Sequence, residues 1–288
     1  MRDKSNQAGA KAQVRATKER ERRVATAIFL AIIILIAAIS AYFTYTFLNQ
    51  PQNQTINPTS SQPKAAIADP LSLTFPNQTF IETATNTLKQ AGYTVDYYPG
   101  EEVNVEFYRN LPTHDYDIII LRVHSAMAHP ESQNPTHLAL FTSEPYTTRK
   151  YVSEQLDSQL WRAVYFEGGL EYFGIGPRFV SFSMKGRFNN TTVIMMGCEG
   201  LKYPVMAQAI TNKGAKVYIG WDKEVSANHT DQATIHLLQN LLIKTQTIEQ
   251  AVSETMKEVG PDPICKSVLT YYPPETGDQK IEDTKTGH

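Results

Sequence analysis

The sequence predicts an α/β domain with a mainly parallel sheet and helices on both of its faces. Apolar runs of strand length alternate with segments whose apolar residues recur at helical spacing. Several helical segments end at a glycine, as at Gly92, Gly214 and Gly260, and glycine is a common helix stop. The run YDIIILRVHS is apolar along most of its length, as in a central strand that is buried on both faces.

Strands and helices follow in a regular order in most of this domain, which we expect to span residues 65–274. The expected strands are residues 64–73, 93–98, 116–125, 138–143, 179–184, 191–197, 215–221 and 267–273, the last at a sheet edge. The expected helices are residues 78–92, 105–112, 201–213, 230–245 and 247–260. Strands that alternate with helices favour a parallel sheet.

The ends of two helices and one irregular region complete this prediction. Thr230 or Asp231 is expected to cap the helix over 230–245, and Thr247 the one that follows. Between residues 137 and 187 the pattern is less regular. The two short strands there are expected to pair as a hairpin around a loop with the sequence FEGGLEYFGIG.

The N-terminal part predicts a membrane anchor. Residues 1–23 hold eight Lys/Arg and three Asp/Glu, whereas the rest of the chain holds 19 and 26. Residues 24–48 then carry no charge, which is long enough for a helix that crosses the lipid bilayer. The positive flank predicts a cytoplasmic N-terminus and a domain outside the membrane. A cleaved signal peptide is the competing interpretation, but this span is longer than its usual apolar region.

The segments on either side of the domain are polar. Residues 49–64 are Pro-rich and predict a flexible linker, and residues 275–288 predict a disordered tail. Five Asn-x-Ser/Thr sequons lie beyond the membrane span and would suit a glycoprotein: Asn53, Asn77, Asn189, Asn190 and Asn228. The basic residues of the N-terminus are not interleaved with aromatic ones, which disfavours nucleic acid as a partner.

The candidate site lies where the strands end. In an open parallel sheet, ligands bind beyond the carboxyl ends of the strands. His124 follows one predicted strand and Cys198 follows another. A thiolate that attacks a carbonyl and an imidazole that moves protons are the minimum for covalent acyl transfer. We expect the N-terminus of the helix from Leu201 to lower the pKa of Cys198, and the N–H groups of Cys198 and Ser125 to hold an oxyanion.

These motifs resemble the caspase-like superfamily of cysteine peptidases, which includes caspases, legumains, gingipains, clostripain and CHAT domains. The sequence MGCEG keeps the Cys-x-Gly of that group, with His124 upstream of it. The segment GCEGLKYPVMAQAITNKGAKVYIGW is similar to CHAT and gingipain-type sequences. The resemblance covers about residues 65–265 and implies a peptide or protein substrate, with Cys198 as nucleophile, His124 as general base and acid, and no cofactor or metal.

The chain departs from this family at two positions. Ser125 follows His124 where relatives usually have Gly, and Gly197 precedes Cys198 where a small or polar residue is common. A family member that has lost catalysis and kept a binding role is therefore the alternative function.

Many relatives accept a basic substrate side chain on an acidic residue. The resemblance points to Asp69 and Asp222, with Trp221 as a wall of the pocket. The alternative is that Asp222 is a loop carboxylate that faces water and that Trp221 is a core residue. Glu199 could point into the site or favour the start of the following helix.

Other interpretations of the two key residues stay open at this level. Cys198 could form a disulfide with Cys265 outside the cytoplasm, or be an inert buried thiol. His124 could be a histidine of the core. The spacing of His124, His129 and His137 fits no zinc pattern. No serine-hydrolase elbow, Walker A loop or complete dinucleotide fingerprint is present in the sequence.

Overall fold

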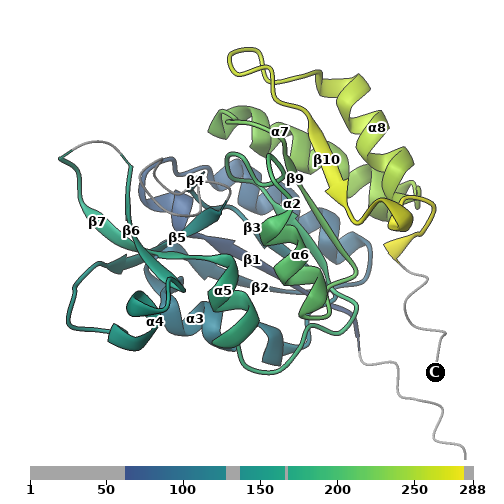
Figure 1. Cartoon of the computed structure of the whole chain (residues 1–288). Helices are drawn as coiled ribbons and strands as arrows, with labels where there is room; N and C mark the ends of the chain where they lie inside the picture. Colours follow the sequence, from purple (N-terminus) through teal and green to yellow (C-terminus); the bar gives the residue numbers. More distant parts are fainter. Residues whose placement is uncertain (1–61, 128–136, 166–167, 282–288) are drawn as a thin grey trace, which may run out of the picture. The chain divides into compact units, whose positions relative to one another are not determined.

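A six-stranded sheet forms the centre of the protein (Figure 1). The computed structural model describes residues 62–127, 137–165 and 168–281. In spatial order the strands are β2 (Thr94–Pro99), β1 (Lys64–Asp69), β3 (Ile118–Leu121), β8 (Thr192–Met195), β9 (Val217–Trp221) and β10 (Leu269–Tyr272). All neighbours pair in parallel except β10, which runs antiparallel to β9 at one edge. The predicted mainly parallel α/β sheet is thus confirmed.

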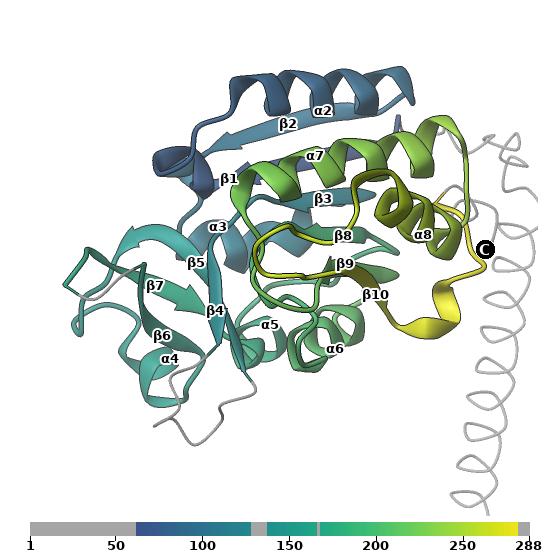
Figure 2. The same cartoon turned by 90° about the horizontal axis from the view of Figure 1, so that it is seen from above.

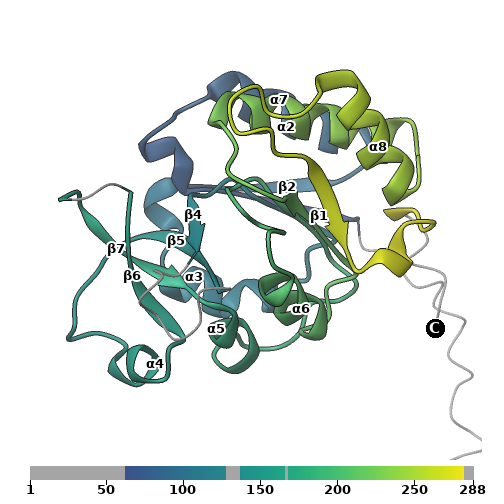
Figure 3. The ribbon, with the colours of Figure 1, turned by 45° about the horizontal axis from the view of Figure 1, so that its top comes forward.

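Helices cover both faces of this sheet (Figure 3). One face packs against α2 (Gln78–Gln90), α7 (Ala227–Leu238) and α8 (Ile248–Val259). The other packs against α3 (Val105–Asn110), α5 (Pro177–Phe182) and α6 (Val205–Asn212). Successive strand residues alternate between the two cores. Ile118 and Ile120 belong to the first, and Ile119 and Leu121 to the second. This double burial explains why the strand is apolar without alternation.

A second sheet is inserted between β3 and β8 and lies beyond the carboxyl ends of the parallel strands (Figure 2). Its four antiparallel strands, in spatial order, are β4 (Ser125–Met127), β5 (Leu138–Pro145), β7 (Glu171–Ile175) and β6 (Leu160–Val164). The short helix α4 (Val152–Leu156) connects β5 to β6. Single helical turns complete the fold: η1 (Pro70–Leu73), η2 (Gly100–Glu102), η3 (Leu111–His114), η4 (Gln239–Ile243) and η5 (Pro274–Thr276).

The inserted region corrects one part of the prediction. The strand expected over residues 179–184 is largely the helix α5, and the expected loop contains the strand β7. Pro177 stands at the start of α5, where its missing N–H does no harm. Phe179 and Val180 both turn into the core, whereas Phe182 is exposed. Two adjacent buried residues are typical of a helix, because in a strand adjacent side chains point to opposite faces. A segment of six residues is too short for this difference to be recognised in the sequence.

Two helices begin at other residues than predicted. Helix α7 starts at Ala227 after Ser226, not at Thr230 or Asp231. Those two side chains are instead buried, because Thr230 bonds to the carbonyl of Met196 and Asp231 pairs with Arg122. Helix α6 starts only at Val205, and turns occupy most of the residues between Cys198 and Pro204. The predicted capping of α8 by Thr247 is confirmed by a capping box.

The described chain also continues beyond the expected end of the domain at residue 274. Ile281 is buried and packs with the core under α8. None of the helices described from residue 62 onward is long and apolar enough to cross a membrane. The span expected over residues 24–48, the basic tail before it and most of the linker lie outside the described residues.

A buried ion cluster holds the carboxyl ends of β1 and β3 to α7. The guanidinium of Arg122 donates to Asp69 Oδ1 at 2.8 Å, and to both carboxylate oxygens of Asp231 at 2.7 and 2.8 Å. It also donates to the carbonyl of Phe75 at 2.8 Å. Burial raises the pKa of the Asp69 carboxyl, although Arg122 acts in the opposite direction. Three segments distant in the sequence therefore meet at one fully buried cation.

We predict that Arg122→Met lowers the free energy of unfolding by about 3–5 kcal/mol, because two buried carboxylates lose their counter-ion. Urea denaturation measures the change. Arg178→Met is the matched control, since Arg178 pairs with Asp157 at the surface and its loss is worth less than about 1 kcal/mol. Equal effects of the two substitutions would contradict a structural role for the cluster.

Candidate active site

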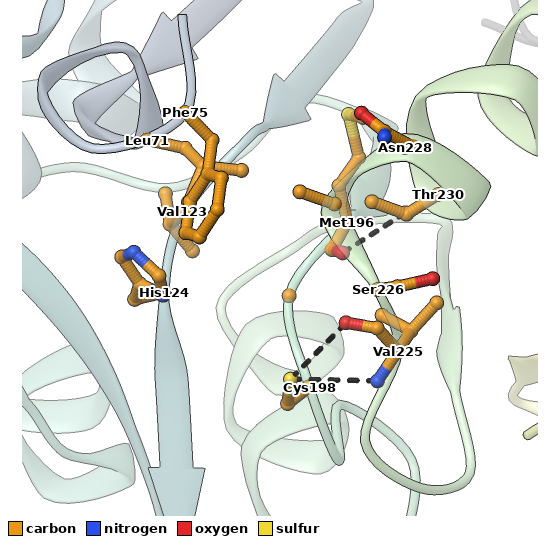
Figure 4. Close-up of a pocket in the computed structure, with 12 residues that line it drawn as sticks. Leu71, Phe75, Val123, His124, Met196, Cys198, Val225, Ser226, Asn228 and Thr230 are labelled. Atoms are coloured by element: carbon orange, nitrogen blue, oxygen red, sulfur yellow. Dashed lines mark hydrogen bonds between the residues drawn. The ribbon is translucent and has the colours of Figure 1, made fainter. Parts of the chain in front are cut away.

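A pocket of about 340 Å³ opens at the carboxyl ends of β1, β3 and β8 (Figure 4). The chain continues from β1 to β2 on one side and from β3 to β8 on the other, so the strand order reverses direction here. Such a switch point is where open α/β sheets bind ligands. The lining residues are Leu71, Phe75, Val123, His124, Met196, Gly197, Cys198, Val225, Ser226, Ala227, Asn228 and Thr230.

His124 stands two residues beyond Arg122 and is held on several sides. Its Nε2 lies 2.8 Å from the hydroxyl of Thr74. That hydroxyl also donates to the carbonyl of Leu71 at 3.2 Å. Both bonds are made together only when His124 carries its proton on Nε2, which leaves Nδ1 as the acceptor. The ring of Tyr165 lies 4.3 Å away between centroids, and that of Phe75 lies 5.9 Å away.

The imidazole of His124 is neutral at neutral pH. Burial lowers its pKa to about 4, and the positive charge of Arg122 acts in the same direction. A neutral imidazole can accept a proton from a thiol, whereas a protonated one cannot.

Cys198 lies on a turn that comes unusually close to β3 and β4. A Cβ on Gly197 would lie 2.5 Å from both Ser125 Oγ and the carbonyl oxygen of Val123. Only glycine allows this approach. Glu199 then takes a left-handed conformation with φ of 59°. The glycine before Cys198 is therefore a packing requirement.

The sulfur of Cys198 contacts the backbone of Val225 (Figure 4). Sγ accepts from Val225 N–H at 3.4 Å and lies 3.6 Å from Val225 O. Burial raises the pKa of the Cys198 thiol, and the negative charges of Glu224 and Glu199 add to this, while the N–H of Val225 acts against it. The expected lowering by a helix N-terminus is wrong, because α6 begins seven residues further on.

Both predicted catalytic side chains line the same pocket, but they are not hydrogen-bonded to each other in the described structure. Figure 4 shows Sγ of Cys198 turned toward Val225 and the ring of His124 on the opposite wall. The two residues therefore line one pocket, while the thiol of Cys198 contacts the backbone of Val225 and not the imidazole of His124.

Ser125 joins the two halves of the site. Its hydroxyl donates to the carbonyl of Cys198 at 2.6 Å. Phe141 N–H donates to the carbonyl of His124, so Ser125 and Leu140 form the adjacent non-hydrogen-bonded pair of the ladder. The N–H of Ser125 therefore points away from β5. Within the described residues the N–H of Cys198 donates to no acceptor. The N–H of Ser125 is therefore not bonded to β5, and the N–H of Cys198 is not bonded to any acceptor of the described residues, so both predicted oxyanion donors are free of these bonds.

The three residues expected to bind substrate do not line this pocket. Asp69 is fully buried and bonded to Arg122. Trp221 is a core residue whose indole N–H donates to Thr230 at 2.9 Å. Asp222 accepts from Val268 N–H at 2.8 Å, between β9 and β10. Glu199, the other acid considered, pairs with Lys202 and accepts from the N–H of Met127.

The alternatives for Cys198 and His124 can also be located. Cys198 and Cys265 are both free thiols, so the structure contains no bridge between them. The N–H of Cys265 donates to Asp262 Oδ1 at 2.7 Å in the loop after α8. In the described ranges no three His, Cys, Asp or Glu side chains gather as potential metal ligands, and His129 lies outside those ranges.

Comparison with known proteins identifies no family. No family model matches the chain. No curated protein matches it. Among solved structures, the crystal structure of a Geobacter sulfurreducens protein, a structural genomics target, shares 9% identity with a TM-score of 0.37. The alignment covers 76% of this chain and 97% of that one. A likeness at this level carries no argument about fold or function.

Sequence reasoning missed Thr74, Phe75 and Val225. All three lie in loops that follow strands β1 and β9, where the same sheet-edge rule would have directed attention. The sheet-edge rule could not have pointed to Tyr165, because this residue follows β6 of the inserted antiparallel sheet and not a strand of the parallel sheet.

We predict that Gly197→Ala lowers the free energy of unfolding by about 1–3 kcal/mol, because the new methyl group would overlap backbone and side-chain atoms at 2.5 Å. Thermal and urea denaturation measure this. Gly200→Ala is the matched control, since its methyl group would meet no atom closer than 3.2 Å. A larger loss in the control would contradict the close packing inferred for Gly197.

We also predict that Cys198 of the native protein reacts slowly with iodoacetamide at pH 7, and that the rate rises up to and beyond pH 9. The raised pKa keeps the thiol protonated below that range. Mass spectrometry of the alkylated peptide measures the rate, with the urea-unfolded chain as reference. Faster labelling of the native thiol than of the unfolded one at pH 7 would overturn the expectation.

Proposed function

We propose that this protein is a caspase-like cysteine peptidase, anchored to a membrane by residues 24–48 with its α/β domain outside the cytoplasm. One observation carries the proposal: His124 and Cys198 follow neighbouring parallel strands, β3 and β8, and line one pocket at their carboxyl ends. This is the order of residues that the resemblance to the family implies. The charge-free segment and its basic flank support the anchor.

The chemistry begins from a neutral pair. Sγ of Cys198 attacks the carbonyl carbon of the scissile peptide bond while its proton passes to Nδ1 of His124. The oxyanion is held by backbone N–H groups, for which those of Cys198 and Ser125 are the candidates. His124 then donates the proton to the leaving amine as the C–N bond breaks, and a thioester remains. Water, deprotonated by His124, hydrolyses this thioester, and the thiol regains its proton.

The resting position of the thiol must change for this reaction. Cys198 has a single side-chain torsion, so a rotamer change is the movement required to take Sγ from Val225 toward His124. A substrate that displaces the contact between Sγ and Val225 would promote the change. The reaction needs no cofactor.

Cys198→Ala and His124→Ala are expected to reduce hydrolysis of a peptide library by on the order of 10³-fold or more, because each removes a group that acts in both steps. Cys265→Ala is the matched control and should retain activity, since Cys265 does not line the pocket. Activity should fall with acid as His124 gains a proton near its pKa of about 4. Equal turnover by the wild type and Cys198→Ala would refute the proposal.

A binding module without turnover is the second candidate. It is favoured by the raised pKa of Cys198 and by the bond of its sulfur to Val225. A peptide with a thiol-reactive group separates the two functions. Pocket-dependent labelling of Cys198 in preference to Cys265 supports the peptidase, whereas saturable peptide binding with no labelling at any pH from 6 to 10 supports the binding module.

A further inference from the structure

We infer that the pocket beside Cys198 takes an uncharged, apolar side chain of a peptide, on the residue that supplies the scissile carbonyl. This inference rests on the proposed function and names its substrate class. It replaces the basic side chain that the resemblance suggested. The position follows from the site, because the pocket that holds this side chain is also lined by the nucleophile and the base.

The walls of the pocket are mainly apolar. Half of the residues that line it are apolar: Leu71, Phe75, Val123, Met196, Val225 and Ala227. Phe75 is 54% exposed, so about half of this apolar side chain is open to solvent. A ligand that packs against this ring would remove its apolar surface from water, at about 25 cal/mol per Å².

No Asp or Glu is among the residues that line the pocket. Asp69 and Asp231 are bound to Arg122 in the interior. Asp262 accepts from the N–H and the hydroxyl of Ser226, and from two further backbone N–H groups. Glu199 pairs with Lys202. Glu224, whose charge also acts on Cys198, is exposed and does not line the pocket. A lysine or arginine in the pocket would be desolvated without a counter-ion.

An acidic side chain is disfavoured for the corresponding reason. Arg122 is fully buried and does not line the pocket, and its charge is already paired with Asp69 and Asp231. His124, the one titratable base in the lining, is neutral. The polar lining groups are engaged as well. Thr230 bonds to Trp221 and Met196, and Ser226 bonds to Asp262. Asn228, the remaining polar side chain in the lining apart from His124 and Cys198, is exposed to solvent.

Peptides of one sequence that differ only at the residue before the scissile bond test this directly, with Leu, Met, Phe, Arg, Lys or Asp at that position. We expect kcat/KM for the apolar members to exceed that for the charged ones by on the order of 100-fold. Turnover that depends on Cys198 but is highest for Arg, Lys or Asp would overturn the inference and leave the peptidase function intact.

A designed reversal sharpens the test. Ala227 is the first residue of α7, where a carboxylate is favoured by the helix N-terminus. Ala227→Asp should therefore fold, and it should raise the Arg-to-Leu ratio of kcat/KM by at least about tenfold. Ala227→Asn has the same shape without the charge and should leave that ratio unchanged. A ratio that both variants leave unchanged would show that Ala227 does not face the substrate, against the inference.

Binding of the same peptides to Cys198→Ala protein gives a readout that does not need turnover. Fluorescence anisotropy should show at least about tenfold tighter binding of the Leu and Phe peptides than of the Arg and Asp peptides. If the wild type hydrolyses nothing while this preference holds, the proposed peptidase function fails and the apolar pocket stands. If every peptide binds equally or not at all, the apolar pocket fails.

Discussion

Arg122 places a positive charge in the interior, between the carboxylates of Asp69 and Asp231, and the site depends on this contact. The cation joins the ends of β1 and β3 to helix α7 and also binds the carbonyl of Phe75. His124 follows two residues later, and Leu71, Phe75 and Thr230 come from the segments that the cation ties together. A buried ion cluster contributes little net stability when compared with an apolar core, but the loss of one member leaves the others as uncompensated buried charges. The cluster thus links the segments that supply these lining residues.

Both catalytic candidates, Cys198 and His124, are uncharged in the resting site. Burial opposes ionisation of both catalytic candidates, since it raises the pKa of the thiol and lowers that of the imidazole. Proton transfer from the neutral thiol to the neutral imidazole creates a thiolate and an imidazolium, and a partly apolar pocket disfavours both charges. The resting pair therefore stays neutral. The N–H of Val225 acts on the thiol pKa in the opposite direction, but this contact holds Sγ on the Val225 backbone, where it has no hydrogen bond to His124.

Much of this architecture could be predicted from sequence, because long buried strands and capped helices leave strong patterns. The six residues of α5 and the three of β4 are too short for such patterns. His124 and Cys198 were found by their places after apolar runs. Asp69 stands in a similar place and was assigned to the substrate, because a strand-end acid looks the same whether it is open or already paired. The signal that was missed is Arg122, a charge inside the apolar run DIIILRV, which required a buried partner.

The residues that line the pocket come from segments far apart in the chain, and their order determines when the site can form during synthesis. Strands β3 and β8 pair residues that are far apart in the chain, such as Ile118 and Thr192. The insertion between them is joined mainly by local antiparallel pairs, which can form early. The pocket is closed last, by Val225 and the first turn of α7. During synthesis the N-terminus is made first, so about a hundred residues are added after His124 before Thr230 can complete the wall of the pocket. Until then the nucleophile has no site in which to act.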